Sequence, residues 1–269
     1  MSALEDLRTH EENSVRRSLS LLNKLRREIN ATILSTELTE FAMSRMRALK
    51  REIELHIRDL ESKLAVNLLA DMRKSFDLGV DIADEPIRPF AALGITLGET
   101  AISKEALRVA TVFSADLIQG LTNDIRSKVS GILRRAALGT MTTQEAITAI
   151  GRNIDKGVFK SVSARAETIF RTEVLRIQSI STQLRQEANA KDVPDGFTFQ
   201  KRWLATHDHR VRPEHLAAEG QTREVDEKFL VGGELLMFPR DPDASAENTI
   251  NCRCVSQSVI EREVVKIAA

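Results

Sequence analysis

The residues best suited to chemistry lie in the last quarter of this 269-residue chain. Its only tryptophan, Trp203, comes first, His215 follows, and the only two cysteines, Cys252 and Cys254, come after them. Two thiolates and one imidazole are a ligand set that Zn²⁺ accepts in tetrahedral sites. The sequence therefore predicts a candidate zinc site of His215, Cys252 and Cys254. Three nearby residues are candidates for the fourth ligand: Asp208, His207 and His209.

Two other interpretations of the same residues remain open. In the first, Cys252 and Cys254 are small buried thiols that pack beside a hydrogen-bonded His215. In the second, Asp208 joins these three residues in a metal-dependent hydrolase or nuclease that activates water. No nucleophile elbow or phosphate-binding loop accompanies them, so the sequence assigns no catalytic residue. Asp208 can also be structural, accepting backbone N–H groups in a turn or pairing with Arg210 or Arg212.

Composition limits the classes of partner. The chain has 39 basic and 39 acidic residues, which argues against a general nucleic-acid binder but leaves a local basic patch open. The residues that could form such a patch and contact DNA are Lys201, Arg202, Arg210 and Arg212.

Cysteine usage and hydropathy predict the compartment. Cysteines that are separated by one residue would close a very small, strained disulfide ring, so we expect reduced thiols. No apolar run is long enough to span a membrane, and the first residues lack the pattern of a signal peptide. The sequence predicts a cytoplasmic protein without a membrane partner.

The first two thirds of the chain have the apolar periodicity of long helices. Residues 1–78 contain neither glycine nor proline, and their leucines and isoleucines recur at helical spacing. We expect two helices that break near Ser35–Thr36, an end at Gly79, and a linker over 79–98. Further helices follow over 99–190, one of them starting at the capping-box pair Thr142 and Glu145.

The pattern changes after residue 196. Phe197, Phe199 and Trp203 alternate with polar residues, as in a strand with one buried face. A diglycine at 232–233 predicts a hairpin, the segment 213–220 a short helix, and the segment 254–259 a last strand. The predicted fold class is α+β, mostly α-helical, with long N-terminal helices and a small C-terminal mixed domain of short antiparallel strands. The predicted regions are a helical arm or bundle over 1–98, a helical middle over 99–190, and a C-terminal domain over 191–269.

The order and spacing of these residues resemble those of the phage Mu F-like minor head proteins, the phage head morphogenesis family, over about residues 120–257. The resemblance is carried mainly by Arg171, Thr172, Glu173, Trp203, Asp208, Arg210, Arg212, His215, Gly220, Asn251, Arg253 and the two cysteines. Some family members have a Cys-x-x-Cys where this chain has Arg212 to His215, so the resemblance does not carry a shared metal site with it.

The resemblance implies a structural role without catalysis. Members of the family are proteins of the capsid interior that associate with the portal, and some contact packaged DNA. The expected partners are therefore the portal protein, capsid or scaffold proteins and double-stranded DNA. The expected locations are the virion interior near the portal and, during assembly, the host cytoplasm.

Overall fold

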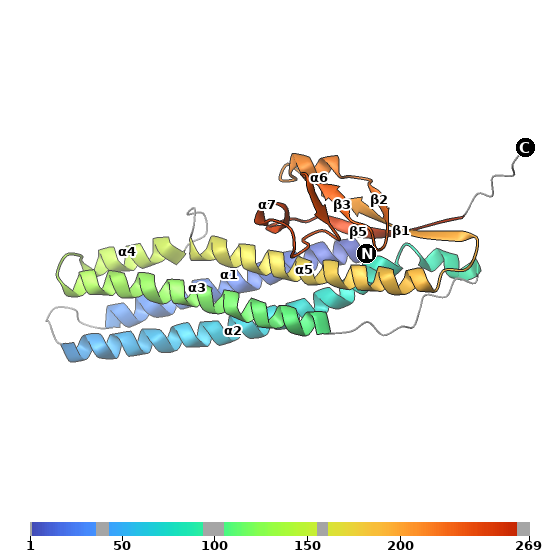
Figure 1. Ribbon diagram of the computed structural model, residues 1–269. Helices are drawn as coiled ribbons and strands as arrows, with labels where there is room; N and C mark the ends of the chain where they lie inside the picture. The colour runs from blue at the N-terminus through green and yellow to red at the C-terminus, as the bar shows by residue number, and fades with distance from the viewer. Residues whose placement is uncertain (1, 36–42, 94–104, 155–160, 263–269) are drawn as a thin grey trace, which may run out of the picture. The chain divides into compact units, whose positions relative to one another are not determined.

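The computed structural model describes residues 2–35, 43–93, 105–154 and 161–262 (Figure 1). It confirms the predicted α+β class, because long helices precede a C-terminal region of short antiparallel strands. The helices are α1 (Ala3–Ser35), α2 (Met43–Asp84), the 3₁₀ helix η1 (Arg88–Leu93), α3 (Glu105–Ala137), α4 (Thr143–Ile154), α5 (Val162–Lys191), α6 (Pro213–Ala217) and α7 (Ala246–Thr249). The strands are β1 (Phe197–Leu204), β2 (Thr222–Glu224), β3 (Phe229–Val231), β4 (Glu234–Leu236) and β5 (Val255–Arg262).

The chain divides into two compact units that are not consecutive in sequence. We call the first the sheet unit; it comprises Met1–Glu11, Asp71–Ala110 and Thr172–Ala269. We call the second the helical unit; it comprises Glu12–Ala70 and Thr111–Arg171. The three consecutive regions expected from the sequence stay a prediction.

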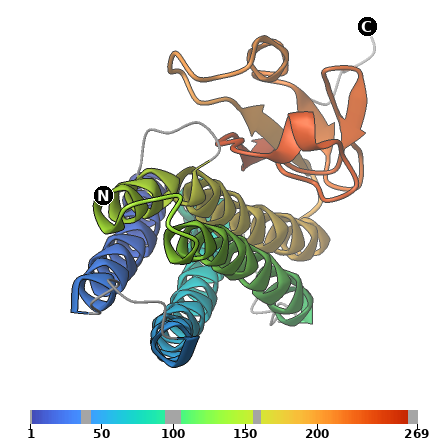
Figure 2. The same cartoon turned by 90° about the vertical axis from the view of Figure 1, so that its left-hand side faces the viewer.

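Most of the buried apolar side chains of the helical unit are leucine and isoleucine. Figure 2 shows the helices of this unit strongly foreshortened. Along α2 the buried positions recur every three or four residues, as the sequence pattern predicted. These positions are Leu49, Ile53, Ile57, Leu60, Leu64 and Leu68.

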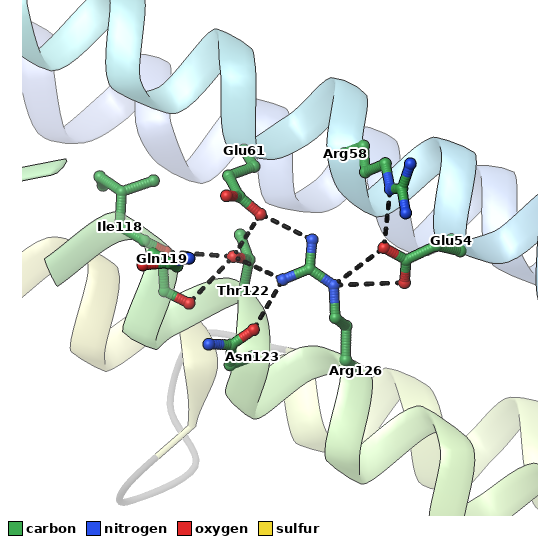
Figure 3. Close-up of polar contacts among 8 residues, drawn as sticks. All are labelled: Glu54, Arg58, Glu61, Ile118, Gln119, Thr122, Asn123 and Arg126. Carbon is green, nitrogen blue, oxygen red and sulfur yellow. Dashed lines mark hydrogen bonds and ion pairs between the residues drawn. The ribbon is translucent and has the colours of Figure 1, made fainter. Parts of the chain in front are cut away.

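An ion-pair network joins α2 to α3 inside the helical unit (Figure 3). The Arg126 guanidinium donates to both carboxylate oxygens of Glu54, at 3.1 and 3.2 Å, and to Glu61 at 2.6 Å. Thr122 donates its hydroxyl to the same oxygen of Glu61 at 2.8 Å. One planar guanidinium therefore bridges two carboxylates that lie about two turns apart on α2, which fixes the register of the two helices.

The helix boundaries agree with the sequence at several points. Helix α1 ends at Ser35, as predicted, whereas Thr36 lies outside the described residues. The predicted capping box is confirmed: the Thr142 backbone N–H donates to Glu145 at 2.7 Å, and the Glu145 N–H donates to the Thr142 hydroxyl at 3.2 Å. The Lys156–Gly157 helix end lies outside the described residues.

The prediction that Gly79 ends the second helix is wrong. Helix α2 continues through Gly79 to Asp84 and ends before Pro86. A Cβ atom at Gly79 would lie 1.9 Å from Ser181 Oγ and 2.5 Å from the Gln178 carbonyl oxygen, both on α5. Glycine is therefore needed here because two helices pack closely within the sheet unit. The start of the predicted 79–98 linker is correspondingly helical.

A three-stranded antiparallel sheet of order β2-β1-β5 forms the strand layer of the sheet unit. Strand β1 pairs with β5 along its whole length, from Phe197 opposite Arg262 to Leu204 opposite Val255. Strands β3 and β4 form the predicted hairpin, in which Gly232 and Gly233 have φ values of 58° and 82°. Two successive positive φ values are those of a type I′ turn, which explains the diglycine.

Within the sheet unit, polar side chains connect strand β5 and the end of α2 to the second half of α5. The Ser256 hydroxyl of β5 donates to Gln186 Oε1 at 3.1 Å, and the Ser258 hydroxyl donates to the Ala83 carbonyl at 2.7 Å. The Thr182 hydroxyl donates to the Gly79 carbonyl at 2.8 Å. Hydrogen bonds therefore fix where α2, α5 and β5 lie within this unit.

None of the helices in the described part of the chain has a stretch apolar enough to cross a lipid bilayer.

Candidate functional site

The candidate site lies around the small core that β1, β3, β4 and α6 enclose. Trp203 and Phe229 are fully buried and meet edge to face, with ring centroids 5.4 Å apart. The His215 ring meets Trp203 in the same manner at 5.9 Å. Cys252 and Cys254 belong to this core, each 2% exposed. The tryptophan, the histidine and the two cysteines, distant in sequence, therefore come together in one place.

His215 faces both cysteines. Its Nδ1 lies 3.4 Å from Cys254 Sγ and 3.5 Å from Cys252 Sγ. The histidine sits in α6, a short helix that begins at Pro213, where a missing N–H costs nothing. The cysteines lie on the segment that leads into β5. The two predicted halves of the site thus meet through direct contacts.

Asn248 orients the imidazole from the other side. Its Nδ2 lies 3.4 Å from the Val231 carbonyl and also donates to the Glu234 carboxylate. These two acceptors fix Nδ2 as the donor end, so Oδ1 is left to accept from His215 Nε2 at 3.3 Å. When the proton is on Nε2, the lone pair of Nδ1 points at the sulfur atoms.

The two thiols are chemically different although they are neighbours, and both are free of disulfide bonds. The hydrogen bond from Cys254 lowers the pKa of Cys252 well below its usual range, and the positive charge of Arg240 acts in the same direction. The same hydrogen bond, together with burial, raises the pKa of Cys254. The hydrogen bond between the two sulfur atoms therefore favours ionisation of Cys252 over ionisation of Cys254.

Arg240 is a residue that sequence reasoning missed. Its side chain is fully buried, and its Nη1 donates to the carbonyls of Cys252 at 3.0 Å and Cys254 at 2.8 Å. Its Nη2 donates to Gln178 Oε1 at 2.9 Å and to the hydroxyl of Ser179. Arg240 also adopts a φ of 68°. Its hydrogen bonds connect the cysteine segment to α5. The sequence around Arg240 does not predict this role, because an arginine in a turn is usually exposed.

Asp208 lies outside the cluster of possible metal ligands, which comprises His215, Cys252 and Cys254 among the described residues. Both Asp208 oxygens instead receive the Arg253 guanidinium, with Nη2 at 2.8 Å from Oδ1. The Arg210 backbone N–H donates to Oδ1 at 2.9 Å, closing a turn. The bidentate bond from Arg253 holds the pKa of Asp208 well below its usual value. This position agrees with the structural interpretation of Asp208.

The other two candidates for a fourth ligand are also apart from the cluster. His207 is 69% exposed, and its Nε2 lies 3.5 Å from a Glu219 oxygen. His209 is exposed as well. The cluster itself borders a small pocket that is lined by His215, both cysteines, Thr206, Val211, Asn251 and three arginines.

Within the Arg-Thr-Glu motif on α5, Thr172 contacts the turn before the cysteines. Thr172 is buried, and its hydroxyl accepts the backbone N–H of Asn251 at 3.2 Å. Asn251 has a φ of 58°, which asparagine tolerates better than most residues. Arg171 pairs with Glu167 and Glu173 with Arg176, both along the helix. The motif therefore anchors the turn that presents Cys252.

Gly220 has a structural part in the same core. Its φ is 77°, and its N–H donates to the Trp203 carbonyl at 2.9 Å. A left-handed residue is needed here to return the chain from α6 to the edge of β1, which explains the glycine.

Lys201, predicted as a DNA contact, is fully buried. It faces the same side of β1 as Phe199 and Trp203, because side chains two apart share a face of a strand. Its ammonium donates to the Met237 carbonyl at 2.8 Å and to Gln183 Oε1 at 3.1 Å. This lysine is therefore part of the interior and does not reach a phosphate.

The other three candidates for DNA contacts remain nearer the surface. Arg202 and Arg210 have side chains that are 38% and 56% exposed. Arg212 donates to the Ile250 carbonyl at 2.7 Å. Each has a local structural partner, so their contact with DNA stays a prediction.

Comparison with known proteins agrees with the resemblance read from the sequence. Residues 132–257 match the model of a family described as Phage Mu protein F like protein. Over 108 residues the chain is 32% identical to YqbB of Bacillus subtilis (strain 168), which is described as an uncharacterized protein. That alignment covers 39% of this chain and only 33% of the relative. No solved structure matches.

The matched segment contains the whole constellation that the structure brings together, from Thr172 on α5 to Cys254 before β5. The family suggests phage head morphogenesis. Over residues 132–257 the chain is therefore similar to the phage Mu F-like proteins.

Proposed function

We propose that the chain is a non-enzymatic minor head protein that acts in phage head assembly by binding the portal and other components of the capsid interior. The observation that carries this proposal is the family match over residues 132–257. It covers β1, β2, the β3–β4 hairpin and the cysteine segment, all of which belong to the sheet unit.

The geometry of the site supports a scaffold rather than a catalyst. The side chains of the motif point into the core or are engaged in structural bonds, as Asp208 is with Arg253. A hydrolase centred on Asp208 would need its carboxylate near the cysteines and His215. In this structure it lies outside that cluster. The motif therefore acts as an internal brace that leaves the outer surface of the domain for partners.

A genetic experiment tests the proposal. In the phage that encodes the chain, a stop codon in its gene should reduce the yield of DNA-filled heads, and wild-type protein supplied in trans should restore it. Negative-stain microscopy of the lysate counts filled and empty heads. Normal heads without the protein would contradict the proposed role.

Portal binding has its own test. A tagged chain, expressed together with the portal protein of the same phage, should retain that portal protein on an affinity column. A test variant exchanges Thr172 for valine, which removes the hydroxyl that accepts the Asn251 N–H. Reduced retention of the portal protein by this variant would support the sheet unit as the part that binds the portal. No retention by the wild type would exclude the portal as a partner.

We propose packaged DNA as a further partner, which Arg202, Arg210 and Arg212 would contact. Binding to duplex DNA at low salt should weaken steeply as the salt concentration rises, because each neutralised phosphate releases counterions. Replacing the three arginines with glutamine should flatten that dependence. Absence of binding by the wild type at low salt would remove DNA from the list of partners.

A further inference from the structure

We propose that His215, Cys252 and Cys254 bind one Zn²⁺ ion, through the imidazole Nδ1 and the two sulfur atoms. This proposal is independent of head assembly, because it concerns the ligands alone. The three ligand atoms lie within 4.8 Å of one another, and all three residues are buried. Thiolate and imidazole ligands select zinc over the oxygen-seeking ions Mg²⁺ and Ca²⁺.

The distances fit a tetrahedral ion. With Zn–S and Zn–N bonds of about 2.3 and 2.0 Å, tetrahedral geometry separates the nitrogen and each sulfur by about 3.5 Å. The observed separations from Nδ1 are 3.4 Å to Cys254 and 3.5 Å to Cys252. One hydrogen bond does not explain two nearly equal distances, because Nδ1 has a single lone pair and accepts one S–H well. A cation between the three atoms would satisfy all of them.

The surroundings prepare the ligands. Asn248 accepts from His215 Nε2 at 3.3 Å, which leaves Nδ1 unprotonated and aimed at the sulfurs. Arg240 Nη1 lies 4.0 Å from Cys252 Sγ, and its positive charge favours the thiolate that a metal requires. These residues supply the outer shell that zinc ligands in proteins usually have.

The fourth ligand comes from the pocket rather than from Asp208. Asp208 is bound at both oxygens by Arg253, and removing it from that pair would leave the arginine unpaired. All three ligand residues line the small pocket described above, through which a water molecule can reach the ion. We therefore assign three protein ligands and one water.

The test uses the full chain, stripped with a chelator under reducing conditions and titrated with Zn²⁺ against a chromophoric chelator. The wild type should take up one zinc ion per chain. His215→Gln and Cys252→Ser should lose stoichiometric binding, and Asn248→Ala should bind about 10- to 100-fold more weakly. Asp208→Asn and His207→Gln are matched controls that should retain one ion. Equal loss in Asp208→Asn, or no uptake by the wild type, would overturn the assignment.

A second measurement needs no variant and so does not depend on variants that fold. Co²⁺ added to the stripped wild type should give thiolate charge-transfer bands and the strong visible bands of a tetrahedral site. Bound Zn²⁺ should also slow alkylation of the two cysteines by a maleimide. Weak octahedral cobalt bands, or unchanged alkylation at saturating zinc, would contradict a Cys₂His centre.

Discussion

Two of the long buried stripes on the described helices, one on α2 and one on α5, differ in their composition. On α2 within the helical unit, the buried positions from Leu49 to Leu68 are all leucine or isoleucine. On α5 within the sheet unit, the buried positions from 178 onward are almost all polar: Gln178, Ser179, Ser181, Thr182, Gln183, Gln186 and Asn189. Both helices are regular and long. Helical form therefore does not require an apolar face when the opposing surface offers hydrogen-bond partners.

The difference predicts different sensitivities. An apolar stripe loses burial energy in proportion to the volume removed, and it tolerates changes that keep that volume. A buried polar stripe depends on each partner, because an unpaired buried group keeps its full desolvation cost. Trp203 makes this comparison measurable, since it is the only tryptophan and belongs to the sheet unit. Its fluorescence reports on that unit, while far-UV circular dichroism reports mainly on the helices.

The largest effect is expected from Arg240→Met. The change leaves the carbonyls of Cys252 and Cys254 and the side chains of Gln178 and Ser179 without their shared donor. Removing one member of such a buried charged network costs about 3–5 kcal/mol. The urea midpoint of Trp203 fluorescence should fall accordingly. Arg210→Met, at a side chain that is 56% exposed, is the matched control and should change little. Equal effects of the two variants would contradict a stabilising role for the hydrogen bonds of Arg240.

Leu64→Ala should weaken the apolar stripe by cavity formation. Leu64 is fully buried, so the change should cost about 2–5 kcal/mol. We expect a lower urea midpoint by circular dichroism. Val66→Ala, two residues away at a side chain that is 64% exposed, should stay within about 0.5 kcal/mol of the wild type. A small loss at Leu64 would mean that this stripe is less tightly packed than its burial indicates.

Lys201 should make the stability of the sheet unit depend on alkaline pH. Burial lowers the pKa of Lys201 to about 8, from its usual 10.5. Between these two values the unfolded chain holds a proton that the folded chain has lost, so stability rises with pH by at most about 3 kcal/mol. Lys201→Met should abolish that rise. Urea midpoints at a series of pH values test this, and parallel profiles for the two proteins would contradict it.

Two helical glycines should respond with opposite signs. Gly79→Ala places a methyl group 2.5 Å from the Gln178 carbonyl, which should cost about 1–3 kcal/mol. Gly131 is an exposed position of α3, and a Cβ atom there would have no neighbour within 4 Å. Gly131→Ala should therefore stabilise the protein by about 0.5–1 kcal/mol. Urea unfolding measures both. Equal signs would show that helix propensity outweighs close packing at Gly79.

The parts of the fold that the sequence predicted depend on local chemistry. The Thr142–Glu145 capping box, the diglycine hairpin and the alternation of Phe199 and Trp203 each follow from neighbouring residues. The meeting of His215 with the two cysteines was also predicted, because few other residues in the chain carry that chemistry.

The parts that were missed depend on distant partners. Gly79 looks like a helix end, and only Ser181 and Gln178 on another helix explain why it is glycine. Lys201 and Arg240 look like surface cations, and their burial follows from acceptors contributed by Gln183 and Gln178. Such acceptors cannot be read from a hydrophobic pattern, because the pattern treats glutamine as solvent-exposed.

The hydrogen bonds from α5 and β5 to Gly79 and Ala83 have a consequence for evolution and for engineering. Both acceptors precede residue 132, where the recognisable homology begins. A fragment trimmed to the homologous segment would lack these acceptors, and we expect it to be insoluble or misfolded. The segment of this chain that matches the family therefore depends for its folding on the end of α2, which lies outside the match.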